Sequence, residues 1–224
     1  MEKKTMDKQQ IEYYHKNISS NTPIILVHTF RDEGMALWAE LQETNCPPCL
    51  LAAVKPEKWE ETLSPWPAKK VFKGTSNFGS GADEHIKQLE EEIIPEIRSH
   101  TGIHEGNCFI CGYSFAGLFA LYSLYRTKAF AGAASVSGSL WFPGFSEYAI
   151  SHEPQRKPER LYLSLGDRES STRNEIMKTV GEKTEALFSH YKSLGIKTIY
   201  EINPGNHFQE PEKRLAKGIR WLIQ

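Results

Sequence analysis

The sequence predicts an α/β fold, with helices on both faces of a doubly wound, mostly parallel sheet. Three observations support this prediction. Six strand-like segments alternate with helix-like segments along the chain. The strand-like segments are almost continuously apolar, as in parallel strands that are covered on both sides. The chain has 224 residues, enough to bury one sizeable core. We therefore expect a single domain over residues 1–224.

The predicted strands are short runs of aliphatic and β-branched residues, bounded by turn residues. They cover residues 23–30, 49–55, 107–113, 131–138, 160–166 and 197–205. The first run follows a polar segment, residues 1–20. For this segment an edge strand and a poorly ordered tail both remain open.

Helices are predicted between the strands, where apolar residues recur at helical spacing. They cover residues 32–44, 81–100, 173–195 and 210–224. The apolar stripe of the second helix consists of Ile86, Leu89, Ile93 and Ile97. Pro95 is expected to kink that helix, because proline removes a backbone hydrogen bond and crowds the preceding turn.

Composition and charge argue against several classes of function. The chain is 39% apolar and 25% charged, with a formal net charge of −1, as in ordinary soluble globular proteins. This balance does not predict a nucleic-acid partner. The polar start lacks the apolar core of a secretory signal, and no apolar run approaches the roughly 20 residues of a membrane span. We expect a cytoplasmic protein without a membrane partner.

Four cysteines form two C-x-x-C pairs, Cys46/Cys49 and Cys108/Cys111. This spacing occurs in zinc and redox sites. Cys108 and Cys111, however, lie three positions apart in a predicted strand, so their side chains point to opposite faces of the sheet. We therefore expect buried thiols, with no metal site and no disulfide framework.

The stretch from Gly112 to Gly117 reads Gly-Tyr-Ser-Phe-Ala-Gly and joins an apolar strand to the most apolar predicted helix. The pattern is typical of a nucleophile elbow, a strained turn that exposes a serine hydroxyl above the sheet and requires small neighbours. Ala116 replaces the more usual glycine and is still small. Ser114 is therefore the candidate nucleophile. The alternative is a serine that only caps the helix.

A nucleophilic serine needs a base, and a carboxylate that orients the base. In α/β hydrolases both follow the serine, the acid before the histidine, beyond the carboxyl ends of strands. Asp167 and Glu169 follow one predicted strand, and His207 follows the last. We favour Glu169, whose position and longer side chain suit contact with His207, while Asp167 remains the alternative that would otherwise cap the turn.

Among the other histidines, only His28 lies at a strand end. The remaining ones, predicted to be surface residues, are His15, His85, His100, His104, His152 and His190.

An oxyanion hole would use the backbone N–H of Phe115, directly after the serine, and a second N–H from the loop after the first strand. In that loop we favour Phe30, with Thr29 or Arg31 as alternatives.

Several segments now carry a resemblance to a known family. GYSFAGLFALYSLY, SVSGSLWFPGF, LYLSLGDRE and PGNHF resemble the "Putative esterase" family of α/β hydrolases, which includes esterase D-like and enterochelin esterase-like proteins. SPWPAKK and FGSGADEHIKQLEEEIIPEI resemble it too, so the likeness covers most of the chain from about residue 23.

The resemblance implies serine hydrolysis of esters without a metal or organic cofactor. It places the nucleophile at Ser114, the acid within residues 166–169 and the base at His207. Two departures stand out. The short N-terminal segment leaves little room for the family's antiparallel strands, and there is no large lid, which predicts an open, shallow pocket.

An irregular segment, residues 55–83, is rich in Pro, Gly, Ser and Trp, and loops of this length are usually functional. Aromatic residues from this segment, from the elbow and from the stretch after SVSGS are candidates for a substrate pocket. They are Trp66, Phe78, Phe115, Trp141 and Phe142.

These residues favour a serine esterase that cleaves a small-molecule ester through an acyl-enzyme. Two alternatives remain open. One is a narrower activity as a siderophore trilactone esterase, and the other is a non-catalytic binding protein that retains the hydrolase fold.

Overall fold

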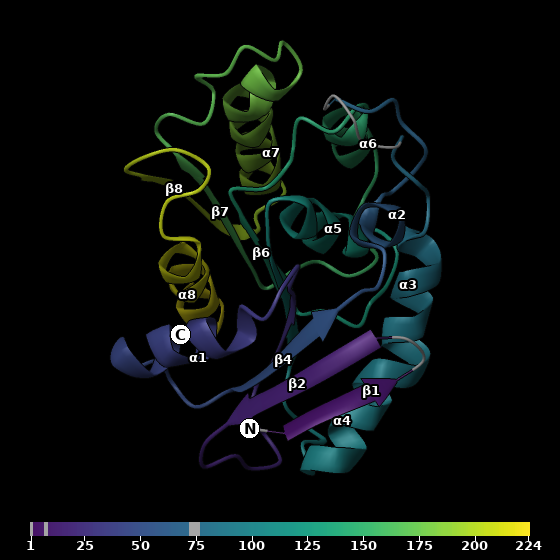
Figure 1. The fold of residues 1–224 in the computed structure, drawn as a ribbon, viewed down its shortest axis with the longest axis vertical. Helices are drawn as coiled ribbons and strands as arrows, with labels where there is room; N and C mark the ends of the chain where they lie inside the picture. The colour runs from purple at the N-terminus through teal and green to yellow at the C-terminus, as the bar shows by residue number, and fades with distance from the viewer. Residues whose placement is uncertain (1, 7–8, 72–76) are drawn as a thin grey trace.

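The structure is a computed structural model that describes residues 2–6, 9–71 and 77–224. In this part of the chain the strands form one eight-stranded sheet with the order β1-β2-β4-β3-β5-β6-β7-β8 (Figure 1). Their bounds are β1 Glu2–Met6, β2 Gln9–His15, β3 Ile24–His28, β4 Leu50–Lys55, β5 Cys108–Tyr113, β6 Gly132–Val136, β7 Arg160–Gly166 and β8 Lys197–Asn203. From β4 to β8 all neighbours are parallel, which agrees with the predicted fold class.

The antiparallel part of the sheet lies at its N-terminal edge. β1 pairs with β2, and β2 pairs with β4, both antiparallel. The chain therefore fits two antiparallel strands into its first 15 residues, although the sequence left little room for them. β2 alternates, with Ile11 and Tyr13 packed on one face of the sheet and Tyr14 on the other. This alternation explains why the segment lacked the continuous apolar signal of the central strands.

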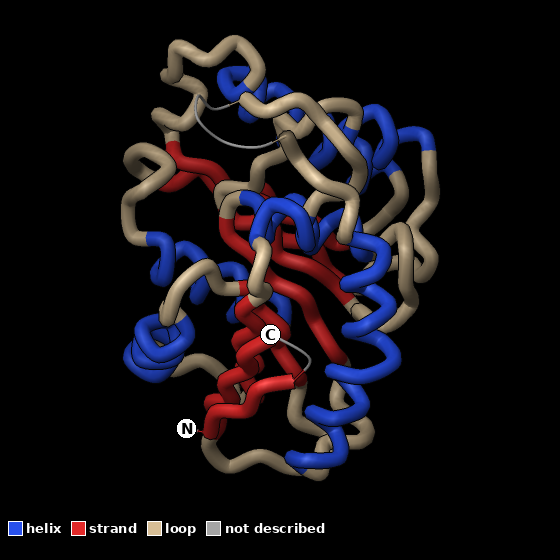
Figure 2. The backbone as a smooth tube through the Cα atoms, turned by 45° about the vertical axis from the view of Figure 1, so that its right-hand side comes forward, coloured by secondary structure: helices blue, strands red, loops and turns tan. Residues whose placement is uncertain are grey.

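Helices cover both faces of the sheet (Figure 2). Their bounds are α1 Gly34–Glu43, α2 Trp59–Leu63, α3 Ala82–Gln88, α4 Ile94–Thr101, α5 Phe115–Ser123, α6 Phe145–Ser151, α7 Val180–Ser193 and α8 Pro211–Leu222. Helices α1 and α8 lie side by side on one face (Figure 1), and α3, α4, α5 and α7 contribute to the core on the other.

The predicted helix 81–100 contains a π-helical turn, η1 Leu89–Ile93, between α3 and α4. In this turn the N–H of Ile94 donates to the carbonyl of Leu89, five residues back. Pro95 then lies in the first turn of α4, where no backbone N–H is needed. The wide turn thus accommodates the proline, where the sequence predicted a kink.

The predicted helix 173–195 also begins later than expected. The Asn174 side chain accepts hydrogen bonds from the N–H groups of Ile176 and Met177, which forms a turn in place of the first helical residues. A short 3₁₀ segment, η2 Met177–Thr179, leads into α7. Two short helices, α2 and α6, were not predicted, and α2 lies within the irregular segment 55–83. Part of that segment, residues 72–76, lies outside the described residues.

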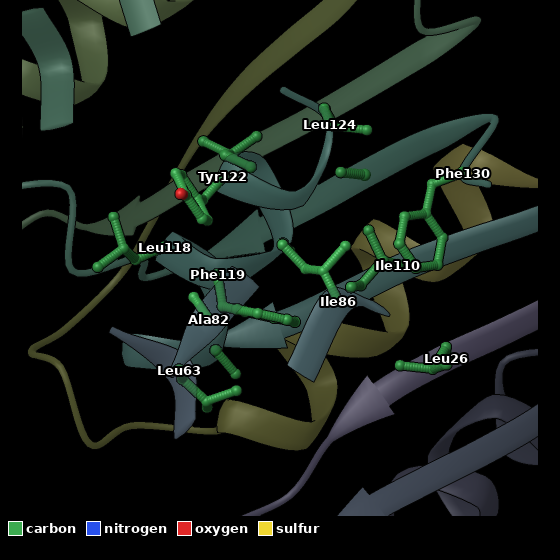
Figure 3. Close-up of a cluster of buried hydrophobic side chains, with 14 of the residues drawn as sticks. Leu26, Leu63, Ala82, Ile86, Ile110, Leu118, Phe119, Tyr122, Leu124 and Phe130 are labelled. Carbon is green, nitrogen blue, oxygen red and sulfur yellow. The ribbon is translucent and has the colours of Figure 1, made fainter. Parts of the chain in front are cut away.

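Helix α5 lies at the centre of the larger core, and every residue in it is buried. Figure 3 shows Phe119 of α5 in one cluster of buried side chains with Ile86 of α3 and Ile110 of β5. All three side chains are almost inaccessible to solvent. Burying a side chain of this size contributes about 2–3 kcal/mol. The packing holds α5, and with it the turn at Ser114, rigidly against the sheet.

Candidate active site

Ser114 lies at the turn between β5 and α5, with φ 58° and ψ −120°. A serine rarely adopts this positive φ, and such strain persists only when the surroundings enforce it. The small neighbours are required sterically. A Cβ atom at Gly112 would lie 2.1 Å from the Ala116 backbone, and one at Gly117 would lie 3.0 Å from the Gly112 carbonyl oxygen. The turn has the geometry of a nucleophile elbow.

The three side chains favoured from the sequence meet at the carboxyl ends of the strands. Ser114 Oγ lies 3.0 Å from His207 Nε2, and His207 Nδ1 lies 2.8 Å from Glu169 Oε2. With its proton on Nδ1, His207 donates to Glu169, and Nε2 accepts from the Ser114 hydroxyl. Glu169 is 4% exposed and His207 30% exposed, so the relay runs from the interior to the surface.

Asp167, the alternative acid, has a different contact. Its Oδ1 accepts a hydrogen bond of 2.8 Å from the N–H of Gly205, two residues before His207. Gly205 has φ 103°, a conformation that favours glycine. Asp167 therefore caps the turn that carries His207, and the structure places Glu169 against the imidazole.

The Glu169 carboxylate has several further donors. Its Oε1 accepts from the Gly166 N–H at 2.6 Å and from Ser137 Oγ at 2.7 Å, and it lies 3.3 Å from Arg214 Nη1. Burial alone would raise the pKa of this carboxyl. Hydrogen bonds from His207, Gly166 and Ser137 outweigh burial and hold the pKa of Glu169 below its ordinary value. Glu169 is thus charged at neutral pH.

The sequence did not predict three residues that contact Glu169 or His207, namely Ser137, Arg214 and Tyr113. The buried Arg214 also donates to the carbonyl of Pro204 at 2.8 Å, and Tyr113 donates to the backbone carbonyl of His207 at 2.6 Å. Arg214 could have been found, because it lies on the buried face of the last helix, four residues before Gly218. A buried arginine requires a partner.

The proposed oxyanion donors have different neighbours. Phe115 is the first residue of α5, so its N–H has no partner within the helix. In the loop after β3, the N–H of Thr29 donates to Val54, and that of Arg31 donates to the Glu33 carboxylate. Within the described residues, the N–H of Phe30 forms no such bond. Of the three loop candidates, only Phe30 retains a donor for a ligand.

A cavity of about 240 Å³ opens beside Ser114. Phe78, Phe115 and Trp141 line it, with the Phe78 and Phe115 rings stacked at 5.3 Å. Trp66 and Phe142 do not line it, so their prediction as pocket residues is wrong. Phe142 is 1% exposed, and Trp66 packs against it and donates from Nε1 to the Pro143 carbonyl. Both support the cavity wall from behind.

His28, the last residue of β3, and His85 of α3 form a buried pair. Their Nε2 atoms lie 2.8 Å apart, and both rings contact Phe119. The surface position predicted for His85 is therefore wrong, since it is only 2% exposed. Burial lowers the pKa of His85 to about 4 and that of His28 well below its ordinary value.

The sheet separates Cys108 from the other three cysteines. Cys108 packs in the core on one face, and Cys111 packs with Cys49 on the other. The three are buried, and Cys46 is half-buried. No cluster of three or more His, Cys, Asp or Glu side chains suited to a metal ion occurs in the part of the chain that the structure describes. In the same residues, every helix is too short or too polar to cross a membrane.

Known proteins resemble this chain in sequence and in structure. YbbA of Bacillus subtilis (strain 168), an uncharacterized protein, is 22% identical over 203 residues, which cover 86% of this chain and 80% of YbbA. An IroE-like serine hydrolase from Shewanella oneidensis has a TM-score of 0.76 and 16% identity, covering 95% of this chain and 74% of its own. The siderophore hydrolase EstA from Aspergillus nidulans has a TM-score of 0.72 and 19% identity, covering 96% and 89%.

At these identities the structural likeness shows a shared α/β-hydrolase fold. The family model described as "Putative esterase" matches residues 37–206, which include the elbow and both strand ends that follow it. The chain therefore belongs to the "Putative esterase" family of α/β hydrolases.

Proposed function

We propose that the protein is a serine esterase in which Ser114 is the nucleophile, His207 the general base and Glu169 the acid that orients His207. The observation that carries this proposal is the continuous hydrogen-bonded relay from Glu169 through His207 to Ser114 Oγ. The strained backbone at Ser114 supports it, because a helix cap ordinarily has β-region backbone angles, whereas Ser114 has φ 58° and ψ −120°.

In the first half of the reaction, Ser114 Oγ attacks the ester carbonyl carbon while His207 Nε2 takes the hydroxyl proton. The carbonyl oxygen becomes an oxyanion, which accepts hydrogen bonds from the N–H groups of Phe115 and Phe30. The intermediate collapses, His207 gives the proton to the departing alcohol oxygen, and an acyl-enzyme remains on Ser114.

In the second half, water attacks the acyl carbonyl carbon and His207 takes the proton from the water. The second tetrahedral intermediate expels Ser114 Oγ, which regains the proton from His207, and a carboxylic acid leaves. Glu169 keeps the imidazole in the correct tautomer and stabilises the imidazolium that forms twice in the cycle. These steps use side chains, backbone N–H groups and water, so we propose no cofactor.

A fluorophosphonate probe tests the proposal, because it phosphonylates activated serines and leaves ordinary ones unmodified. We expect one label on the wild-type protein, located at Ser114 by peptide mass spectrometry, and none on Ser114→Ala. Ser139→Ala is the matched control, because Ser139 Oγ lies only 3.4 Å from Ser114 Oγ. It should still take up the probe. Equal labelling of wild type and Ser114→Ala would refute the assignment, and an unlabelled wild type would favour a binding protein.

A further inference from the structure

Two cavities meet at Ser114. Beside the cavity of about 240 Å³ lies a second one of about 470 Å³. Both are lined by Ser114 and His207, and Trp59, Glu60 and Phe208 stand where they join. An ester bound with its carbonyl carbon at Ser114 Oγ therefore extends into both, with its acyl and alcohol groups in different surroundings.

The walls of the smaller cavity are mainly apolar. Besides the aromatic residues already described, Met177 and Val180 line it. Its size and lining suit a compact apolar group of the ester.

The larger cavity carries negative charge. Glu33, Glu60 and Glu212 line it, and all three are half-buried. Within the described residues none of them forms an ion pair, and the Glu33 carboxylate accepts only the N–H of Arg31. Three lysines from the same stretches of chain pair with other carboxylates, as Lys55–Asp32, Lys58–Glu61 and Lys213–Glu210.

Aromatic rings complete the wall of the larger cavity. Phe30, Trp59, Tyr113 and Phe208 line it, with the edge of one ring against the face of the other in the Phe30–Trp59 pair, whose centroids lie 5.5 Å apart. No lysine or arginine in the described chain lines it, and the nearby Arg31 guanidinium lies against the Phe30 ring. Carboxylates and aromatic faces together stabilise a desolvated organic cation.

We propose that the preferred ester carries a cationic group, such as a quaternary or protonated amine, which binds in the larger cavity among Glu33, Glu60 and Glu212. The smaller cavity then takes a compact apolar group on the other side of the ester bond. This inference rests on the proposed function. It argues against an anionic substrate, such as the iron-loaded form of a catechol trilactone, because the carboxylates of the cavity would repel its negative charge.

The test compares each cationic ester with a neutral ester of the same shape. Acetylthiocholine and S-(3,3-dimethylbutyl) thioacetate differ only in a charge on the leaving group. The p-nitrophenyl esters of 4-(trimethylammonio)butanoic acid and 5,5-dimethylhexanoic acid differ only in a charge on the acyl group. In one of the two pairs we expect kcat/KM to be about 5- to 10-fold higher for the cationic ester. High salt should reduce the preference, because it screens charges.

Glu212→Gln should lower that ratio about 3-fold, because it removes one carboxylate without changing the shape of the side chain. Glu91→Gln is the matched control: it removes the same charge from an exposed site on the helix segment η1, and it should leave both the ratio and the activity unchanged. If p-nitrophenyl acetate is hydrolysed but neither cationic ester is preferred, or if Glu212→Gln leaves the ratio unchanged, this inference is overturned and the proposed function stands. Inactivity toward p-nitrophenyl acetate as well would overturn both.

Discussion

The buried pair of His28 and His85 predicts that the fold loses stability between pH 7.5 and pH 5. In the unfolded chain His85 has its ordinary pKa of 6.5, whereas burial in the folded protein lowers the pKa to about 4. At pH 5 the unfolded chain therefore binds a proton that the folded protein must release. The stability contribution is complete above pH 6.5, and it falls as the pH drops from 6.5 to 4.

These two pKa values set the magnitude. At pH 5 a group with a pKa of 6.5 unfolded and about 4 folded lowers the free energy of unfolding by about 2 kcal/mol relative to pH 7.5. The lowered pKa of His28 acts in the same direction. Glu169 adds little in this window, since its pKa lies below 4.5 in the folded protein and its contribution is lost only at lower pH.

Urea denaturation followed by circular dichroism at pH 7.5, 6 and 5 measures this loss. His85→Gln is the informative variant, because glutamine can still hydrogen-bond to His28 but does not titrate. We expect the variant to lose less stability than the wild type over this range, by about 2 kcal/mol. Parallel curves of stability against pH for the two proteins would refute the argument.

Three further predictions follow from the site and the core. Glu169→Gln should keep the fold and lower kcat by about 10²–10⁴, whereas Asp167→Asn should act mainly through stability; steady-state kinetics beside thermal melts would detect the reverse pattern. Replacing Cys46 and Cys49 by serine should leave kcat/KM within a few-fold, because we expect these thiols to bind no metal. A stoichiometric zinc ion in the purified wild-type protein would contradict that expectation. Phe119→Ala should destabilise the protein by about 3–5 kcal/mol in urea titrations, and a loss below 1 kcal/mol would show that the core around α5 is loosely packed.

The sequence predicted the central sheet and the strand ends well, because these depend on local patterns. Continuous apolar runs identify buried parallel strands, and the order of serine, acid and histidine follows from the direction of the chain. The late start of α7 was missed because the Asn174 side chain competes with the helix for the first N–H groups.

Side-chain direction was harder to predict, because it depends on packing between distant segments. Trp66 and Phe142 are aromatic residues in the same irregular segments as Phe78 and Trp141, but they face into the core behind the cavity. His85 lies four residues before Leu89 of the apolar stripe, so its burial could have been inferred from helical spacing.

The central claim is that Ser114 performs nucleophilic attack, and the hydrolysis of p-nitrophenyl acetate by wild type and Ser114→Ala tests it most directly. Both proteins should be purified in parallel and shown to have the same circular dichroism spectrum and melting temperature. The account predicts that kcat of Ser114→Ala falls by about 10⁵–10⁶, as in other serine hydrolases that lose the nucleophile. Turnover by the folded variant within ten-fold of the wild type would contradict the account.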